Sequence, residues 1–358
     1  MLIVSKEKRV LKKKNLILLS SLGAALLVTG CGNHKKNENV ATAMQLVEEL
    51  SYEDALASFD EALLNGEDKE LIYRGEGLAY MGLSEYQDAV ECFLKAFQYC
   101  NGRTGALEYD MNYYLATSYA KLEQYDQAEA VYTSILDMKP KSIDALYLRG
   151  CVRLKQNLKD AAVTDFEKAM SLKTDDIDLI VDVYQALAAE GYADEGAVYL
   201  RDIMDKQGKK MDDFSLGKIN FYLGDYENAR IHLDSALNGT DAEAILLLGQ
   251  TYEALGDLNY AAVVYNTYLE KGTPDVQILN RLGVCKMKQE NYEDALKAFE
   301  DAIAIQPNSI IRTVKFNEIV ANEYLGRFDV AKSLMSDYLN NYPDDSAAKR
   351  ENEFLMTR

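Results

Sequence analysis

The strongest constraint on the fold of this chain is a twelve-residue phrase that recurs along most of its 358 residues. Six clear copies begin at residues 52, 86, 125, 226, 292 and 328, and three less regular copies begin at 159, 193 and 258. Each clear copy reads aromatic, two residues, small, three residues, large apolar. Self-similarity at a fixed period is typical of stacked units that cannot bury their apolar faces alone. The sequence therefore predicts a row of similar units.

The spacing of the copies indicates what each unit is. Seven of the eight intervals between their small residues are 32 to 36 residues long, and one is 39; these markers are Ala55, Ala89, Ala128, Ala162, Gly196, Ala229, Ala261, Ala295 and Ala331. A second helical phrase precedes most markers, as in residues 71–82, 111–122, 245–256 and 278–289. Each unit is therefore predicted to be a pair of helices.

A helix pair with a period of about 34 residues resembles the tetratricopeptide repeat. The positions that match the family's motif include the small residue of the first helix (Gly77, Gly150, Gly249, Gly283), its later aromatic (Tyr80, Tyr119, Tyr252) and the closing proline (Pro140, Pro307, Pro343). The chain departs from the motif in having no tryptophan. The resemblance implies an all-α fold, an α-solenoid superhelix of about nine helix pairs over residues 41–345. A capping helix is expected at residues 346–358, where Asp345 or Ser346 can cap its start.

The N-terminus carries a second signal. Basic residues crowd positions 6–14, a largely apolar run fills 16–30, and the sequence VTGC follows at 28–31. This resembles a bacterial lipoprotein signal peptide, which implies cleavage after residue 30 and a diacylglycerol on Cys31, followed by a polar tether to residue 40. The diacylglycerol supplies two acyl chains, which bind a protein stably to a membrane, whereas a single chain binds it only weakly and reversibly. The expected location is the extracytoplasmic face of a bacterial cell membrane. The alternatives are an ordinary cleaved signal peptide or an uncleaved anchor.

Composition narrows the function. The formal charge of −19 would repel nucleic acid phosphates and is compatible with basic partner segments, but the simpler explanation is a solvated acidic surface. Two histidines, five cysteines without a Cys-x-x-Cys pair, and no phosphate-binding or zinc-protease motif leave no catalytic or metal-binding constellation. The expectation is a protein that is not an enzyme, with no cofactor and no metal.

The resemblance implies a concave wall of first helices that holds peptides or partner domains. Counting from the marker residues places twelve candidates on it: Arg74, Tyr113, Thr117, Tyr147, Gln185, Phe214, Lys218, Tyr222, Gln250, Asn280, Phe316 and Tyr324. Tyrosine and arginine often dominate binding energy, and acids at the groove edge, Asp110, Asp144, Asp178, Asp182 and Glu253, would attract basic residues. The alternative for each candidate is packing against a neighbouring repeat.

Two functions of different class remain. The first is a membrane-anchored scaffold or adaptor that binds protein or peptide partners in its concave groove and helps to assemble envelope or secretion complexes. The second is an accessory subunit, or an enzyme that uses the abundant carboxylates on cell-envelope material. A cluster of acids inside a closed pocket would favour the second function, and acids along an open groove would favour the first.

Overall fold

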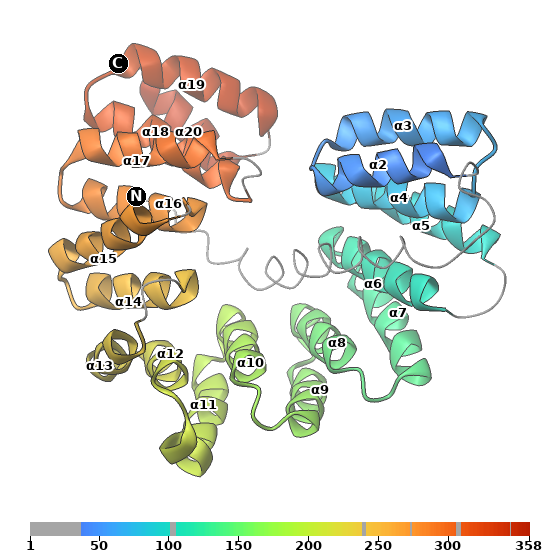
Figure 1. Ribbon diagram of the computed structural model, residues 1–358, viewed down its shortest axis with the longest axis horizontal. Helices are drawn as coiled ribbons and strands as arrows, with labels where there is room; N and C mark the ends of the chain where they lie inside the picture. The colour runs from blue at the N-terminus through green and yellow to red at the C-terminus, as the bar shows by residue number, and fades with distance from the viewer. Residues whose placement is uncertain (1–36, 101–104, 238–240, 273, 306–308, 344) are drawn as a thin grey trace. The chain divides into compact units, whose positions relative to one another are not determined.

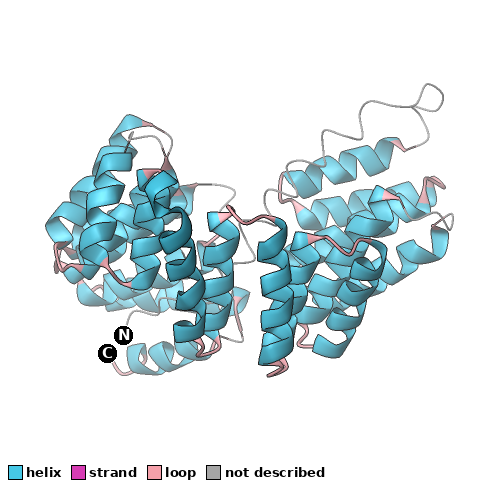
Figure 2. Cartoon of the chain, turned by 90° about the horizontal axis from the view of Figure 1, so that it is seen from below, coloured by secondary structure: helices cyan, strands magenta, loops and turns pink. Residues whose placement is uncertain are grey.

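The computed structural model describes residues 37–358, apart from 101–104, 238–240, 273, 306–308 and 344. The described residues form nineteen α-helices, α2 to α20, and contain no β-strand (Figures 1 and 2). The prediction of an all-α fold is confirmed. Residues 1–36, and with them Cys31, lie outside the described part of the chain.

In chain order, eighteen helices make nine pairs and α20 follows them. The pairs are α2 (Glu38–Glu48) and α3 (Tyr52–Leu64), α4 (Lys69–Leu83) and α5 (Tyr86–Tyr99), α6 (Ala106–Lys121) and α7 (Tyr125–Met138), α8 (Ile143–Lys155) and α9 (Lys159–Leu172), α10 (Ile177–Ala189) and α11 (Ala193–Gln207), α12 (Asp213–Leu223) and α13 (Tyr226–Ala236), α14 (Ala242–Ala254) and α15 (Leu258–Lys271), α16 (Val276–Lys288) and α17 (Tyr292–Ala304), and α18 (Ile311–Tyr324) and α19 (Phe328–Asn341). A short 3₁₀ helix, η3 (Gly208–Lys210), follows α11, and α20 spans Ser346–Leu355.

The chain divides within α11 into two compact units, the first ending at Tyr199 and the second running from Leu200 to Arg358. Inside each unit the two helices of most pairs contact each other, and most second helices contact the first helix of the next pair. Most first helices also contact the next first helix. First helices therefore lie beside first helices, as α4 lies beside α6 in one unit and α14 beside α16 in the other. This nearest-neighbour stacking is the organisation expected of a helical repeat array.

Local sequence explains where the helices begin and turn. Most first helices start at an aspartate or serine whose side chain accepts hydrogen bonds from the first exposed backbone amides; these residues are Asp68, Ser142, Asp176, Asp212, Asp241 and Asp275, and Asp345 does the same for α20. Between the two helices of each pair one residue has a left-handed backbone: Leu50, Ser84, Glu123, Asn157, Gly191, Gly224, Gly256, Glu290 and Gly326. One left-handed residue per pair reverses the chain after each first helix.

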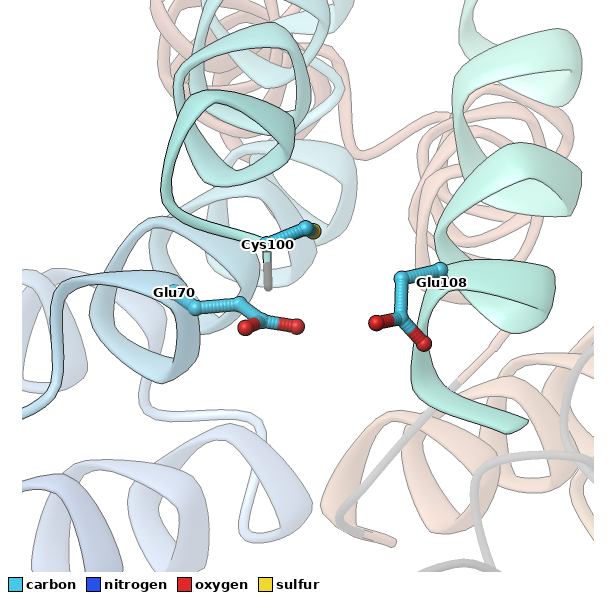
Figure 3. Close-up of side chains that lie close together, drawn as sticks. All are labelled: Glu70, Cys100 and Glu108. Atoms are coloured by element: carbon cyan, nitrogen blue, oxygen red, sulfur yellow. The ribbon is translucent and has the colours of Figure 1, made fainter. Parts of the chain in front are cut away.

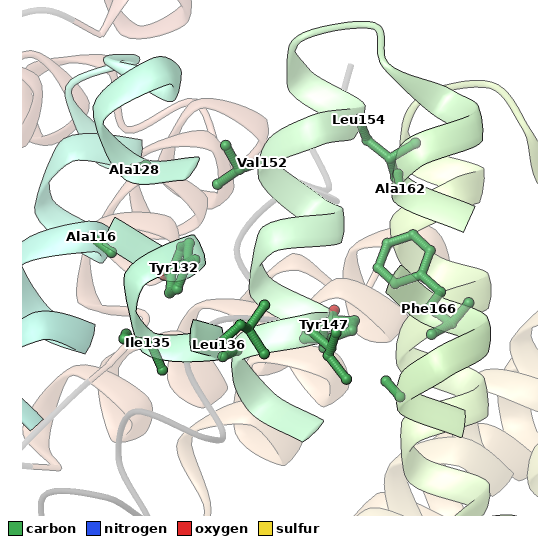
Figure 4. Packing of buried hydrophobic residues seen from close by; sticks show 14 of the residues in the cluster. Ala116, Ala128, Tyr132, Ile135, Leu136, Tyr147, Val152, Leu154, Ala162 and Phe166 are labelled. Carbon is green, nitrogen blue, oxygen red and sulfur yellow. The ribbon is translucent and has the colours of Figure 1, made fainter. Parts of the chain in front are cut away.

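The aromatic residues of the second helices pack over glycines of the first helices. A Cβ atom at Gly283 would lie 2.4 Å from the ring of Phe299, and one at Gly150 would lie 2.4 Å from the ring of Phe166. Real Cβ atoms do not approach so closely, so only glycine lets these rings reach the first helix. Figure 4 shows the resulting core around Tyr132, Tyr147 and Phe166 in the first unit. The recurring glycine predicted from the sequence thus sets the spacing within a pair.

No helix in the described part of the chain is both long enough and apolar enough to cross a bilayer.

Candidate functional site

Four of the twelve predicted groove residues lie in the protein interior. Arg74, Thr117, Tyr147 and Lys218 are only 2% to 7% exposed, so a partner cannot reach them while the repeats stay stacked. Seven others are half-buried, and Tyr324 is 58% exposed; the seven are Tyr113, Gln185, Phe214, Tyr222, Gln250, Asn280 and Phe316. The groove itself stays a prediction, with fewer side chains available to a partner than the sequence pattern indicates.

In the first unit two predicted residues, Tyr113 and Arg74, contact the neighbouring repeat, and Thr117 contacts the other helix of its own pair. The hydroxyl of Tyr113 on α6 lies 2.7 Å from that of Ser142, which caps α8, and the Thr117 hydroxyl lies 3.3 Å from that of Tyr132. The guanidinium of Arg74 on α4 lies 6.0 Å from the ring centre of Tyr114 on α6. These side chains are therefore engaged in holding the stack together.

The second unit repeats this arrangement with polar pairs between consecutive first helices. Lys218 on α12 donates to Glu243 on α14 at 2.9 Å, and Arg281 on α16 donates to Gln250 on α14 at 3.1 Å. Asn317 on α18 donates to Asn280 on α16 at 2.9 Å. We call these three pairs the inter-repeat ties. One member of each tie, Lys218, Gln250 or Asn280, is a predicted groove residue, and in the structure it contacts the adjacent repeat.

The acids predicted at the groove edge are also partly engaged. Glu253 accepts from the Tyr265 hydroxyl and from Lys288, each at 2.8 Å, so its charge is already compensated within the unit. Burial raises the pKa of Asp110, and the charges of Arg74 and Lys139 partly oppose that rise. The attraction of this wall for a basic partner is correspondingly weaker than the acid count suggests.

A buried carboxylate in the first unit escaped the sequence analysis. Asp165 on α9 accepts from Arg149 Nε at 2.8 Å, Arg149 Nη2 at 2.7 Å and Arg153 Nη1 at 2.8 Å. Arg153 also donates to Glu129 on α7 at 2.7 Å. The cluster therefore links α7, α8 and α9. Each of its two acids is paired with an arginine, so the cluster offers no free acid or base for catalysis.

One group of three potential metal ligands occurs among the described residues. Ligand atoms of Glu70, Cys100 and Glu108 all lie within 4.8 Å of one another, and Figure 3 shows the three side chains converging. Burial, followed by the charge of and a hydrogen bond to Glu70, raises the pKa of the Cys100 thiol to about 12. The thiol is therefore protonated at neutral pH and is a poor nucleophile. Three partly exposed ligands on their own do not define a metal centre.

An apolar groove lies between α13 and α15 in the second unit. A cavity of about 200 Å³ is lined by Leu237 at the end of α13, by Ile245 and Leu248 of α14, and by α15 residues Tyr260, Val263 and Val264. We call this surface the α13–α15 groove. It contains one carboxylate, Asp234, and one cation, Lys271. A single carboxylate does not supply the acid pair that a carboxylate-dependent hydrolase needs.

Sequence reasoning missed this groove, although a signal was present. Tyr260 and Val263 occupy the positions that Asp294 and Lys297 occupy in the following repeat, relative to the markers Ala261 and Ala295. The positions are exposed in both helices, so apolar residues at this register of α15 stand out from the polar pattern. A register comparison of the exposed positions would have singled them out.

Comparison with known proteins supports the repeat assignment. Models of the tetratricopeptide repeat match residues 113–176 and 276–309. A DnaJ homolog subfamily C member 7 homolog of Dictyostelium discoideum is 25% identical over 227 residues, covering 61% of this chain and 36% of that protein. A TPR repeat-containing protein of Methanocaldococcus jannaschii is 24% identical over 250 residues, covering 65% and 38%. This chain thus spans well under half the length of both relatives.

Among solved structures, a tetratricopeptide repeat protein of Parabacteroides merdae is 15% identical, with a TM-score of 0.44, over 80% of this chain and 98% of that one. The pairing of helices, the packing of rings over glycines and the two segments matched by the family models together support one assignment. The chain carries tetratricopeptide repeats, recognised directly in residues 113–176 and 276–309, within an all-α array of consecutive helix pairs.

Proposed function

We propose that this protein is a membrane-anchored extracytoplasmic scaffold that binds protein or peptide partners and serves the assembly of envelope or secretion complexes. The observation that carries the scaffold part is the side-by-side stacking of first helices inside each unit. Such stacking produces an extended surface rather than a closed active site, and repeat proteins use surfaces of this kind for binding.

Half-exposed aromatic side chains support a binding role for that surface. In the second unit Phe214, Tyr222 and Phe316 are half-buried on first helices, and Tyr324 is exposed at the end of α18. Aromatic residues with one apolar face and an accessible edge are common anchors in protein interfaces.

The anchoring part of the proposal rests on the sequence before residue 37. A basic segment, a fifteen-residue apolar run at 16–30 and a cysteine after two small residues agree with a lipoprotein signal. The polar residues that follow Cys31 would hold the repeats close to a bilayer.

Lipidation is tested by expressing the full chain with an alkyne-bearing palmitate. The native chain is expected to take up the label and to enter the detergent phase on Triton X-114 partition, and Cys31→Ala to lose both properties. Cys100→Ala provides the matched control, since Cys100 lies in the helical array and should not affect labelling. Equal labelling of Cys31→Ala and the native chain would overturn the anchor.

Partner binding is tested by crosslinking in native membranes. The native chain is compared with a Tyr222→Ser, Tyr324→Ser double variant and with a Leu94→Ser, Val330→Ser control, which changes exposed apolar residues of second helices. One partner is expected with the native chain and the control, and its loss with the double variant. Recovery of the same proteins with all three chains would refute binding at the first-helix wall.

A further inference from the structure

The α13–α15 groove has a floor and walls that are already formed in the free chain. Ile245 and Leu248 are buried beneath it, whereas Val263 is 55% exposed and Tyr260 52% exposed at its edge. A cavity of 150 Å³ in a protein core is large enough for benzene. The groove therefore has room for one large apolar side chain without displacing its own residues.

Contacts between side chains keep this groove open. The ring of Tyr260 packs on that of Tyr252 with their centres 4.7 Å apart, and the Tyr252 hydroxyl donates to Asp234 at 2.9 Å. Nη1 of Arg230 lies 3.7 Å from Oδ2 of Asp234, the same oxygen that accepts the hydrogen bond from Tyr252. A wall that is fixed before binding loses little entropy when a ligand arrives.

The rim of the groove is acidic on balance. Asp234 lines one end. Asp241 caps α14 four residues before the lining residue Ile245, and Asp275 caps α16 four residues after the lining residue Lys271. At Tyr268, which lines the cavity as well, burial raises the pKa of the phenol, and the charges of Asp275 and Asp241 raise it further. Against these three acids stand Lys271 and Arg230, and Arg230 also pairs with Glu227. The field at the rim favours a cation on an incoming segment.

We propose that the α13–α15 groove binds a basic segment of a partner protein, with one large apolar side chain in the cavity and an adjacent lysine or arginine at the acidic rim. The groove is a separate surface from the first-helix wall, because its walls are the second helices α13 and α15 and only its apolar floor comes from α14. The inference depends on neither the lipid anchor nor the first-helix wall, so each can fail without the other.

The test uses a phage library of random dodecapeptides selected on the full chain. Selection is expected to enrich peptides in which a leucine, phenylalanine or other large apolar residue lies within two positions of a lysine or arginine. The enriched peptide is then synthesised and its binding measured by fluorescence anisotropy. Val263→Lys should weaken binding at least tenfold, because it places a cation over the cavity.

Two features of the chain provide matched controls. Lysine is already present at the equivalent exposed position of α17, Lys297, so Val263→Lys is expected to fold, and its circular dichroism spectrum checks this. Val330→Lys, on α19, changes an apolar residue of similar exposure away from the groove and should leave binding within twofold. Asp234→Asn should weaken binding of the same peptide two- to fivefold, because it removes charge from the rim without removing volume.

Three results would overturn the proposal: no enriched sequence, enrichment of peptides without basic residues, or equal binding by native protein and Val263→Lys. Sedimentation equilibrium addresses a different occupant. A native dimer that becomes monomeric in Val263→Lys would mean that a second copy of this chain covers the groove, which also contradicts a basic partner segment.

Discussion

Replacing Asp165 by asparagine tests whether the buried ion cluster holds the first unit together. The native carboxylate receives three charge-assisted hydrogen bonds from Arg149 and Arg153, and its side chain is 3% exposed. Asparagine keeps the shape but turns one acceptor into a donor that faces the guanidinium groups. Two cations would then remain in the interior, with one of them left without a carboxylate partner in this cluster.

The magnitude follows from burial and from what each arginine keeps. Removing one partner of a buried ion pair costs about 3 to 5 kcal/mol. Arg153 retains Glu129 at 2.7 Å, and both guanidinium groups have some contact with solvent, so we expect the lower end, about 3 kcal/mol. For a unit of this size, 1 kcal/mol corresponds to about 2 to 4 °C, which predicts a Tm about 6 to 12 °C lower for the first unit.

The assay is urea unfolding of the full chain followed by circular dichroism, with hydrogen exchange measured separately on α8 and α9. The control is Glu195→Gln, which removes the exposed pair of Lys159 and Glu195 in the same unit and should leave the urea midpoint nearly unchanged, because exposed ion pairs contribute little to stability. Exchange in α8 and α9 should accelerate in Asp165→Asn and not in the control. A cost below 1 kcal/mol, or one equal to that of Glu195→Gln, would refute the reasoning.

Three further predictions concern the C-terminal helices. Burial alone would raise the pKa of Asp345, but hydrogen bonds from Tyr338, Arg312 and the Ala348 amide lower it to about 2. The stability that Asp345 gives to α20 is therefore present above pH 4 and lost as the pH falls towards 2. Asp345→Asn should abolish that pH dependence in the hydrogen exchange of α20. Burial, then the neighbouring Glu351, raises the pKa of Glu323 to about 8, so the fold is most stable with this carboxyl protonated and loses stability as the pH rises through 8. Glu323→Gln should therefore increase the free energy of unfolding more at pH 9 than at pH 5, and an equal increase at both would contradict this. Gly283→Ala should destabilise by about 1 to 2 kcal/mol, because overpacking against Phe299 exceeds the gain in helix propensity, whereas Gly272→Ala, with nothing within 4 Å of its Cβ, should change stability little in the same urea titration.

The sequence predicts the helix pairs well because their packing depends on residues that recur. Gly283 and Phe299 form one contact, and the same glycine and ring occur at fixed offsets in other repeats. Both residues that form the interface within a pair, the small one and the large one, therefore recur in the sequence and can be predicted from its period. The turn between the helices is equally local, since it needs only one left-handed residue.

The contacts between pairs could not be predicted in the same way. Counting from the markers places Lys218, Gln250 and Asn280 on first helices, but periodicity does not tell whether such a side chain ends in solvent or on the adjacent repeat. Their partners, such as Glu243, lie outside the recurring phrase. Asp165 illustrates the same limit, because its two arginines come from the preceding helix and resemble ordinary surface residues in the sequence.

The inter-repeat ties also bear on how the chain folds as it emerges, whether from the ribosome or on the far side of a membrane. They join residues only 25 to 37 positions apart, so a tie can form as soon as the next first helix exists. A helix forms in microseconds or less, whereas synthesis at 5 to 20 residues per second supplies one such pair only about every 2 to 7 seconds. Each new pair can therefore pack against a neighbour that is already folded. Only the apolar face of the most recently formed pair stays exposed until the next pair forms. An array built this way limits the time during which nascent chains could aggregate.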